Sequence, residues 1–264
     1  MSVHRQEDRL PPVLSGRKAL VVGIANDRSI AWGCAQAMHR AGAMVAMTYL
    51  NERTRPHVEP LAQALDAGIF MPLEVRDAGQ VAELYDAIDS KWGTLDILVH
   101  SIAFAPREAL QGRVTDCSRD GFLTAMEVSC WSLLELSRRA EPLMRNGGTI
   151  ITMSYVGSNE VIENYGIMGP VKAALESSVR YMATELGPKG IRVHAVSPGP
   201  LATRAASGIR DFDELMEKVS ARAPARRLVT IEEVGAACVF LASDYAAAMT
   251  GETLYIDGGY HILG

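Results

Sequence analysis

The chain has 264 residues, of which 48% are hydrophobic and 22% are charged, values typical of a soluble globular protein. The net charge of -5 comes from interleaved acidic and basic residues without a Lys/Arg-rich run, which argues against nucleic-acid binding as the main role. No apolar run approaches the ~20 residues of a membrane span, and the charged N-terminus lacks a signal-peptide core, so we expect a cytoplasmic protein.

Strand-like and helix-like patterns alternate along the whole chain. Residues 1–13 predict a flexible leader, and residues 19–22 are a continuous apolar run, typical of a strand buried on both faces of a parallel sheet. Gly23 ends this run, and a helical pattern follows from about residue 29 to residue 40. Further predicted strands lie at 44–49, 69–73, 95–100, 149–153, 191–196 and 253–256, and further helices at about 52–65, 78–92, 118–145, 165–186 and 231–242.

This alternation predicts an α/β fold, a Rossmann-like doubly wound parallel sheet of about seven strands flanked by helices. No internal repeat or linker is present, so residues 14–264 are expected to form a single domain. A short amphipathic segment at about 203–226 interrupts the alternation.

The turn between the first strand and the first helix is a candidate nucleotide site. Gly23 and Gly33 are ten residues apart, with Ser29 and Ile30 at the expected helix start. A glycine there allows close approach of a pyrophosphate, and the helix N-terminus favours its negative charge. The usual GxGxxG is absent, and because such a turn needs a glycine anyway, the turn alone leaves a purely structural role open.

The stretch 154–172 carries two tyrosines and a lysine. Tyr165, Met168 and Lys172 are spaced i, i+3, i+7, so on a helix they would share one face. A phenol and an ammonium on one face can donate a proton and hold a hydroxylated ligand. Such a pair more often marks the edge of the core, so the spacing alone leaves both interpretations open.

Seven short motifs follow one another in order along residues 14–259. They are Gly23-(x5)-Ser29-Ile30-Ala31-x-Gly33, His100-Ser101-Ile102-x-Phe104-Ala105, Tyr155-(x9)-Tyr165-(x6)-Lys172, Arg180-Tyr181-Met182-Ala183, Gly199-Pro200-x-x-Thr203, Ala205-Ala206-Ser207-Gly208-Ile209 and Asp257-Gly258-Gly259. Together they resemble the bacterial enoyl-acyl carrier protein reductases, a divergent branch of the short-chain dehydrogenase/reductase superfamily. The resemblance implies hydride transfer from a nicotinamide cofactor to the β-carbon of a trans-2-enoyl thioester in fatty-acid synthesis.

The resemblance also implies a cofactor site. Gly23, Ser29 and Ile30 would line the pyrophosphate, and Ile102 would lie beside the adenosine and ribose. Glu74 and Val75 would contact the adenine. Lys172 would bind the nicotinamide ribose, and Leu201 and Thr203 would hold the carboxamide. Glu74 departs from the aspartate usual in the family.

Cofactor choice should depend on the residues after Tyr49. Family members that use NADPH tend to place basic residues there, whereas this chain has Leu50 and Asn51, followed by Glu52, which would repel a phosphate. We therefore expect NADH, with NADPH as the alternative.

The same resemblance implies a catalytic and a substrate site. Tyr165 would donate a hydrogen bond to the thioester oxygen, where negative charge develops as an enolate, and Tyr155 would shape the pocket near the thioester. The acyl chain would lie between one wall and a lid at 203–226; the wall residues are Phe104, Ala105, Leu110, Tyr155 and Met168, and the lid residues are Ala205, Ala206, Ile209 and Phe212.

Two alternatives stay open. An ordinary short-chain dehydrogenase acting on ketones or alcohols needs Tyr-x-x-x-Lys, but four residues before Lys172 stands Met168. The longer step from Tyr165 would retract the phenol by about one helical turn (~5 Å), which favours C=C over C=O reduction. The second alternative is a non-catalytic nucleotide-binding protein, against which the intact Tyr165 and Lys172 pair argues.

The resemblance further implies an acidic acyl carrier protein as partner and a homotetramer. Basic residues that could meet the carrier are Arg204, Arg210, Lys218, Arg222, Arg226 and Arg227. No metal is expected, because the histidines show no metal-ligand spacing, and His100 is interpreted as a satisfied imidazole at the edge of the core. The cysteines, none in CxxC spacing, are expected to be buried free thiols.

Overall fold

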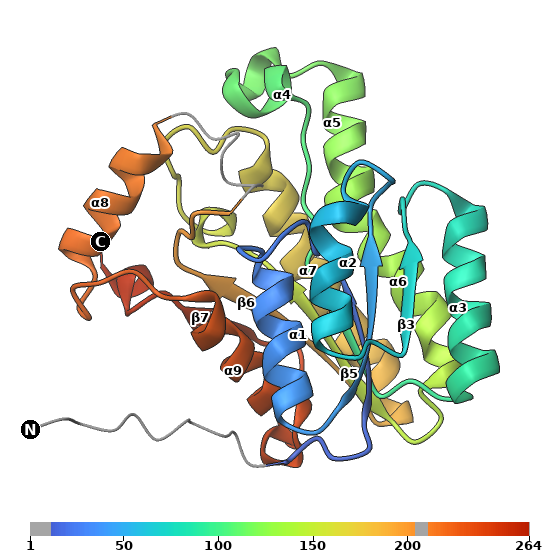
Figure 1. Cartoon of the computed structure of the whole chain (residues 1–264). Helices are drawn as coiled ribbons and strands as arrows, with labels where there is room; N and C mark the ends of the chain where they lie inside the picture. The colour runs from blue at the N-terminus through green and yellow to red at the C-terminus, as the bar shows by residue number, and fades with distance from the viewer. Residues whose placement is uncertain (1–11, 204–210, 264) are drawn as a thin grey trace, which may run out of the picture.

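The computed structural model describes residues 12–203 and 211–263, and one seven-stranded parallel sheet lies at its centre (Figure 1). The strand order is β3-β2-β1-β4-β5-β6-β7. The strands are β1 (Lys18–Val22), β2 (Met44–Tyr49), β3 (Ile69–Pro72), β4 (Ile97–His100), β5 (Gly148–Met153), β6 (Ile191–Pro198) and β7 (Thr253–Ile256). The predicted fold class and all seven predicted strands are confirmed, with ends that differ by at most two residues.

Helices cover both faces of the sheet. They are α1 (Ile30–Arg40), α2 (Arg55–Ala64), α3 (Ala78–Trp92), α4 (Arg107–Gln111), α5 (Arg119–Met126), α6 (Ser132–Ala140), α7 (Met168–Leu186), α8 (Phe212–Arg222) and α9 (Ile231–Ala242). Buried side chains of α1, α2 and α9 share one apolar core with the sheet, and those of α3, α5, α6 and α7 share the other. Two cores, one on each face, are what a doubly wound sheet requires.

Local signals explain where the helices begin. The Asp77 side chain accepts hydrogen bonds from the backbone N–H groups of Gly79 and Gln80 and so caps α3, while Thr230 and Glu233 form a reciprocal capping box at the start of α9. Both starts agree with the sequence prediction.

Two helical predictions need correction, and one helix was not predicted. The helix predicted at 118–145 is divided, because the five-residue π turn η2 (Glu127–Trp131) separates α5 from α6. The helix α7 begins at Met168 rather than at residue 165. The short helix α4 was not predicted, since five residues are too few to show a helical period.

The helices α1 and α9 pack with their backbones in close approach. A Cβ atom added to Gly33 would lie 2.3 Å from the carbonyl oxygen of Ile231, and one added to Gly235 would lie 2.3 Å from the carbonyl oxygen of Gly33. Glycine is therefore required at both positions. The close packing against α9 fixes the start of α1, which directly follows the candidate nucleotide turn.

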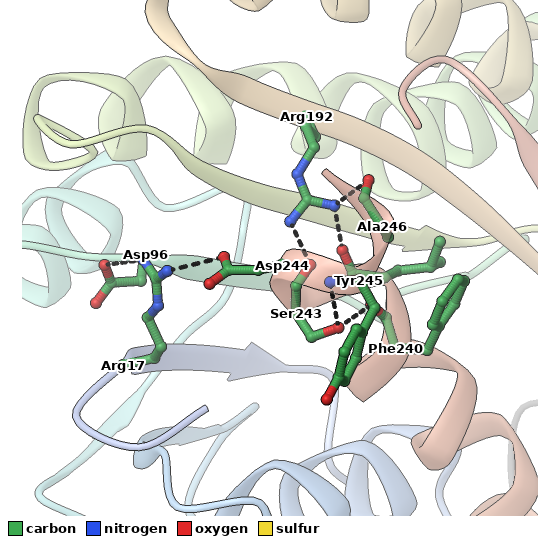
Figure 2. Close-up of polar contacts among 9 residues, drawn as sticks. Arg17, Asp96, Arg192, Phe240, Ser243, Asp244, Tyr245 and Ala246 are labelled. Atoms are coloured by element: carbon green, nitrogen blue, oxygen red, sulfur yellow. Dashed lines mark hydrogen bonds and ion pairs between the residues drawn. The ribbon is translucent and has the colours of Figure 1, made fainter. Parts of the chain in front are cut away.

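Polar contacts tie together the amino-terminal edge of the sheet (Figure 2). Arg192 of β6 donates to the carbonyl oxygens of Leu241, Ser243 and Ala246 at the end of α9. Arg17 contacts Asp96 at 3.5 Å and Asp244 at 3.2 Å. Because Arg192 satisfies carbonyl groups at a helix C-terminus, this edge serves to hold α9 in place.

The opposite, carboxyl edge of the sheet contains the point where the strand order reverses, between β1 and β4. In α/β sheets, ligands bind in the crevice at this point. Gly23 follows β1 with φ +102°, and a Cβ atom there would lie 2.0 Å from the carbonyl oxygen of Ser101, which follows β4. Only glycine allows the two loops to meet this closely. Within residues 12–203 and 211–263, no helix is long and apolar enough to cross a membrane.

Candidate active site

A cavity of about 180 Å³ lies at the carboxyl edge of the sheet. Twelve residues that the sequence singled out line it: Ile30, Ile102, Phe104, Ala105, Leu110, Tyr155, Tyr165, Met168, Lys172, Leu201, Thr203 and Phe212. The structure thus brings the predicted catalytic side chains, the whole predicted substrate wall and part of the cofactor set into one space.

Other lining residues were not predicted as site residues: Ser101, Ala103, Met153, Ser154, Pro198, Gly199 and Pro200. Each lies at or directly after the carboxyl end of β4, β5 or β6. Position relative to the strand ends could have identified them, since the loops at this edge surround the ligand crevice.

Tyr165 lies in a turn before α7 and not on the helix, so the predicted shared helical face for Tyr165, Met168 and Lys172 is wrong. Gly166 adopts φ +53°, and a Cβ atom there would lie 2.4 Å from the carbonyl oxygen of Leu110. This left-handed residue breaks the helical path between Tyr165 and Met168. The retraction of the phenol by one helical turn therefore does not apply, although Tyr165 still lines the cavity together with Lys172.

The two tyrosines contact each other at the cavity wall. The ring centroids of Tyr155 and Tyr165 are 4.9 Å apart, with an interplanar angle of 61°. The buried hydroxyl of Tyr155 has no hydrogen-bond partner among the described residues. Burial raises the pKa of both phenols, so both stay protonated near neutral pH and can act as hydrogen-bond donors.

Lys172 lies on α7 and is 4% exposed. Its ammonium donates one of its hydrogen bonds to the carbonyl oxygen of Met153 at 2.6 Å. Burial lowers the pKa of Lys172 to about 8, although the neighbouring Cys130 and Glu176 raise it. The side chain is therefore mostly cationic at neutral pH and lines the cavity as a donor.

The nucleotide turn is shaped by Ser29, which precedes α1. The Ser29 hydroxyl accepts hydrogen bonds from the backbone N–H groups of Ala25 and Asn26, each at 3.0 Å. Its side chain does not cap α1. The N–H groups of Trp32 and Gly33 bond to the Ser29 carbonyl oxygen, and the first N–H groups of a helix, here those of Ile30 and Ala31, are the ones that can receive an anion. Gly23 and Ser29 do not line the 180 Å³ cavity itself, but Ile30, the next residue, does.

The remaining predicted cofactor residues lie away from this cavity. Leu50 is 48% exposed, Val75 is buried, and the Glu74 carboxylate pairs with Arg76 at 3.2 Å. The roles that the resemblance implies for these three residues stay predictions.

Arg55, which follows the segment expected to decide cofactor choice, is engaged by acidic side chains. Arg55 contacts Glu52 at 3.5 Å and Glu59 at 3.1 Å, and its guanidinium lies 5.7 Å from the ring centroid of Tyr49. Glu52 also accepts a hydrogen bond from the Tyr49 hydroxyl at 3.1 Å. Glu52 and Glu59 thus leave Arg55 already paired with acidic side chains.

His100 is a buried core residue, as predicted. Its Nδ1 atom lies 2.8 Å from Thr152 Oγ1, and its Nε2 atom lies 2.8 Å from Ser132 Oγ. Burial and the charge of Lys172 lower the pKa of His100 to about 3, so the imidazole is neutral and structural. All four cysteines are free; Cys34, Cys130 and Cys238 are buried, and Cys117 is partly buried.

Part of the predicted lid lies outside the described residues. This holds for Arg204, Ala205, Ala206, Ile209 and Arg210. The described part contains α8, whose first residue, Phe212, lines the cavity. The C-terminal end of α8 packs through Val219 and Ala223 against Tyr260.

A family model described as enoyl-(acyl carrier protein) reductase matches residues 23–261. The chain belongs to this family. The NADH-dependent enoyl-acyl carrier protein reductase of Nostoc sp. is a member that is 48% identical over 254 residues, covering 95% of this chain and 98% of its own. The NADH-dependent reductase of Bacillus cereus is 44% identical and covers 96% of this chain and 99% of its own.

Solved reductase structures share the whole fold. The enzyme of Anaplasma phagocytophilum, crystallised in complex with NAD, superimposes with a TM-score of 0.93 at 44% identity and covers 97% of this chain and 98% of its own. The NADH-dependent enzyme of Aquifex aeolicus gives a TM-score of 0.92 at 43% identity and covers 96% of this chain and 99% of its own. The resemblance inferred from short motifs is therefore confirmed along nearly the full length of the chain.

Proposed function

We propose that this protein is an NADH-dependent enoyl-acyl carrier protein reductase, which saturates the trans-2 C=C bond of an acyl thioester in fatty-acid biosynthesis. The observation that carries the proposal is the cavity at the switch point of the sheet, where Tyr155, Tyr165 and Lys172 meet beside the nucleotide turn. Family membership and the NADH-dependent relatives support the same reaction.

The residues present fit a nicotinamide dinucleotide. Tyr155 and Lys172 line a cavity that reaches Ile30 at the start of α1, and Gly23 lets the loops after β1 and β4 meet closely at the switch point. Gly23, Ser29 and Ile30 would hold the pyrophosphate, and Lys172 the nicotinamide ribose hydroxyls. Bound NADH supplies the hydride that the β-carbon of the substrate accepts.

The two phenols would act on the thioester carbonyl. Negative charge develops on that oxygen as the β-carbon is reduced, and a fixed donor there stabilises the transition state more than the ground state. Tyr165 is the proposed donor, because burial keeps its phenol protonated. Tyr155, in edge contact with it, would orient the ring of Tyr165 and exclude water from the thioester.

The ordinary short-chain dehydrogenase alternative is weaker. The position four residues before Lys172 is Met168, the first residue of α7, so no phenol stands where a ketone or alcohol dehydrogenase needs one. Met168 lines the cavity and would contact the acyl chain with Phe104, Ala105 and Leu110.

The proposed protein partner is the acyl carrier protein that bears the substrate. Lys218, Arg222, Arg226 and Arg227 are exposed at the end of α8 and just beyond it, where an acidic carrier could dock. Arg227 is held by Glu233 at 2.6 Å, so Lys218 and Arg226 are the better candidates for direct contact.

A homotetramer is the proposed assembly. Large apolar side chains are exposed on α5, the π turn η2, α6 and α7; they are Phe122, Leu123, Trp131, Leu134 and Tyr181. Exposed apolar surface of this kind marks protein interaction sites, and sedimentation equilibrium would measure the mass of the assembly.

Oxidation of NADH, followed with enoyl thioesters of several chain lengths and with a ketoacyl thioester, tests the proposal. We expect turnover with the enoyl substrates and a clear preference for NADH over NADPH. Turnover of the ketoacyl substrate alone would favour the dehydrogenase alternative.

A further inference from the structure

A buried carboxylate lies one helical turn beyond Lys172. Glu176 of α7 is 4% exposed, and the reductase mechanism described above does not use it. It accepts hydrogen bonds from the hydroxyls of Ser154 at 2.5 Å and Ser158 at 2.7 Å, and from the Asn159 amide at 3.4 Å. A buried carboxylate is costly unless it is hydrogen-bonded, and here all three of these donors come from one short segment.

That segment, residues 154–159, carries part of the active site. It contains Tyr155, and Ser154 lines the cavity. Immediately before it, the carbonyl oxygen of Met153 accepts the hydrogen bond from Lys172. Lys172 and Glu176, four residues apart on one face of α7, therefore hold the same stretch of chain: Lys172 binds it before Tyr155, and Glu176 binds it both before and after Tyr155.

The segment also sets the position of Tyr165. A Cβ atom added to Gly157 would lie 2.6 Å from the Tyr165 ring, and the Tyr155 ring contacts the Tyr165 ring edge-on. A displacement of the segment would therefore move both phenols relative to the ammonium of Lys172.

Glu176 acts on Lys172 electrostatically as well. Its negative charge raises the pKa of Lys172, which burial lowers to about 8. The other titratable groups coupled to Lys172 are Cys130 and His100. Tyr165 and Tyr255 have a raised pKa to which Glu176 also contributes.

We propose that Glu176 is a positioning residue: its carboxylate clamps the segment 154–159 onto α7 and so aligns Tyr155 and Tyr165 with the ammonium of Lys172. This inference rests on the proposed reductase function. The clamp extends to the last strand, because the Asn159 amide also donates to the Tyr255 hydroxyl of β7 at 3.0 Å.

The test compares Glu176→Ala and Glu176→Gln with the matched control Glu185→Gln, an exposed glutamate on the same helix. Three quantities are measured on the full-length protein: kcat with an enoyl thioester, the Kd of NADH from pH 6 to pH 10, and urea unfolding without cofactor. Urea unfolding gives the folded fraction under assay conditions, by which each kcat is corrected.

We expect Glu176→Ala to lower kcat on the order of 10²-fold, because a small displacement of reacting groups has effects of this size. Glu176→Gln keeps the shape and an acceptor oxygen, so it should restore most of kcat at pH 7. Because it removes the negative charge beside Lys172, NADH affinity should decline at a lower pH than in the wild type. Glu185→Gln should match the wild type in all three measurements.

Wild-type kcat in Glu176→Ala, after correction for the folded fraction, would overturn the proposal. If that variant does not fold, the double variant Ser158→Ala/Asn159→Ala takes its place, because it removes the two donors that Glu176 holds beyond Tyr155. Wild-type kcat in this double variant, after the same correction, would overturn the proposal. A wild-type protein that binds NADH without reducing enoyl thioesters would count against the proposed function alone. The clamp would then be judged by urea unfolding, and an equal free energy of unfolding in the wild type and Glu176→Ala would overturn it.

Discussion

The rings of Tyr155 and Tyr165 meet edge to face, with their centroids 4.9 Å apart, although ten positions separate them in the chain and neither lies on a helix. Tyr155 follows β5, and Tyr165 lies in the turn that precedes α7. The two phenols therefore reach one cavity from opposite ends of the same loop.

Replacing each tyrosine by phenylalanine should separate their roles. Tyr165→Phe removes the proposed donor to the thioester oxygen and should lower kcat by about 10²–10³-fold, with the Kd of NADH unchanged. Tyr155→Phe should have a smaller effect on kcat. Because the Tyr155 hydroxyl is buried without a partner among the described residues, its loss should leave the free energy of unfolding unchanged or slightly higher. Equal loss of kcat in both variants would contradict this division of roles.

Gly157→Ala should displace the ring of Tyr165 while leaving its phenol group chemically unchanged. The added methyl would lie 2.6 Å from the Tyr165 ring, so the ring must shift, and kcat should fall while NADH still binds. Gly187→Ala is the matched control, since a Cβ atom there meets nothing within 4 Å. Steady-state kinetics and NADH titration of both variants check the prediction; a normal kcat in Gly157→Ala would show that the ring position is not critical.

NADH affinity should depend on the charge of Lys172. Burial lowers the pKa of Lys172 to about 8, so the ammonium is present below this pH and lost above it. Affinity for NADH should therefore be high at pH 7 and decline as the pH rises through about 8. Lys172→Met should bind NADH more weakly at pH 7 and lose this pH dependence. A decline of the same size in Lys172→Met would assign the titration to another group.

Two buried histidines should make the fold sensitive to acid. Burial lowers the pKa of His100 to about 3 and that of His194 to about 4, whereas an unfolded histidine titrates near ~6.5. Below that pH the unfolded chain binds more protons than the folded chain, so the free energy of unfolding falls as the pH drops toward the folded-state values.

Urea unfolding at pH 7.5 and pH 5 should show a loss on the order of 2 kcal/mol for each histidine. His194→Leu places an apolar side chain at this buried position and removes its titration. That variant should lose less stability between the two pH values than the wild type. An identical loss would exclude His194 as a source of acid sensitivity.

The sequence predicted the sheet and the contents of the cavity better than the geometry of the catalytic loop. Apolar runs of strand length identified every strand, because strands buried on both faces need continuous apolar residues. The predicted helical position of Tyr165 was wrong, because Gly166 takes a left-handed conformation and packs against the carbonyl oxygen of Leu110. That contact belongs to the short helix α4, which shows no pattern of its own.

The buried position of Glu176 also escaped prediction. A glutamate in an amphipathic helix is usually solvated, and its partners Ser154 and Ser158 lie in an irregular loop whose path no periodicity reveals. One signal was present, since Glu176 is four residues after Lys172 and thus shares its face of α7.

The central claim is that the protein reduces C=C rather than C=O. Its most direct test uses NADH with two deuterium atoms at C4 and measures where the transferred deuterium is found in the product. The protein is incubated with this cofactor and a trans-2-enoyl thioester, and the product is analysed by mass spectrometry. The account predicts a saturated acyl thioester with one deuterium atom at the β-carbon. Unchanged enoyl thioester, together with deuterium on the carbinol carbon of a hydroxyacyl product when a ketoacyl thioester is offered instead, would contradict it.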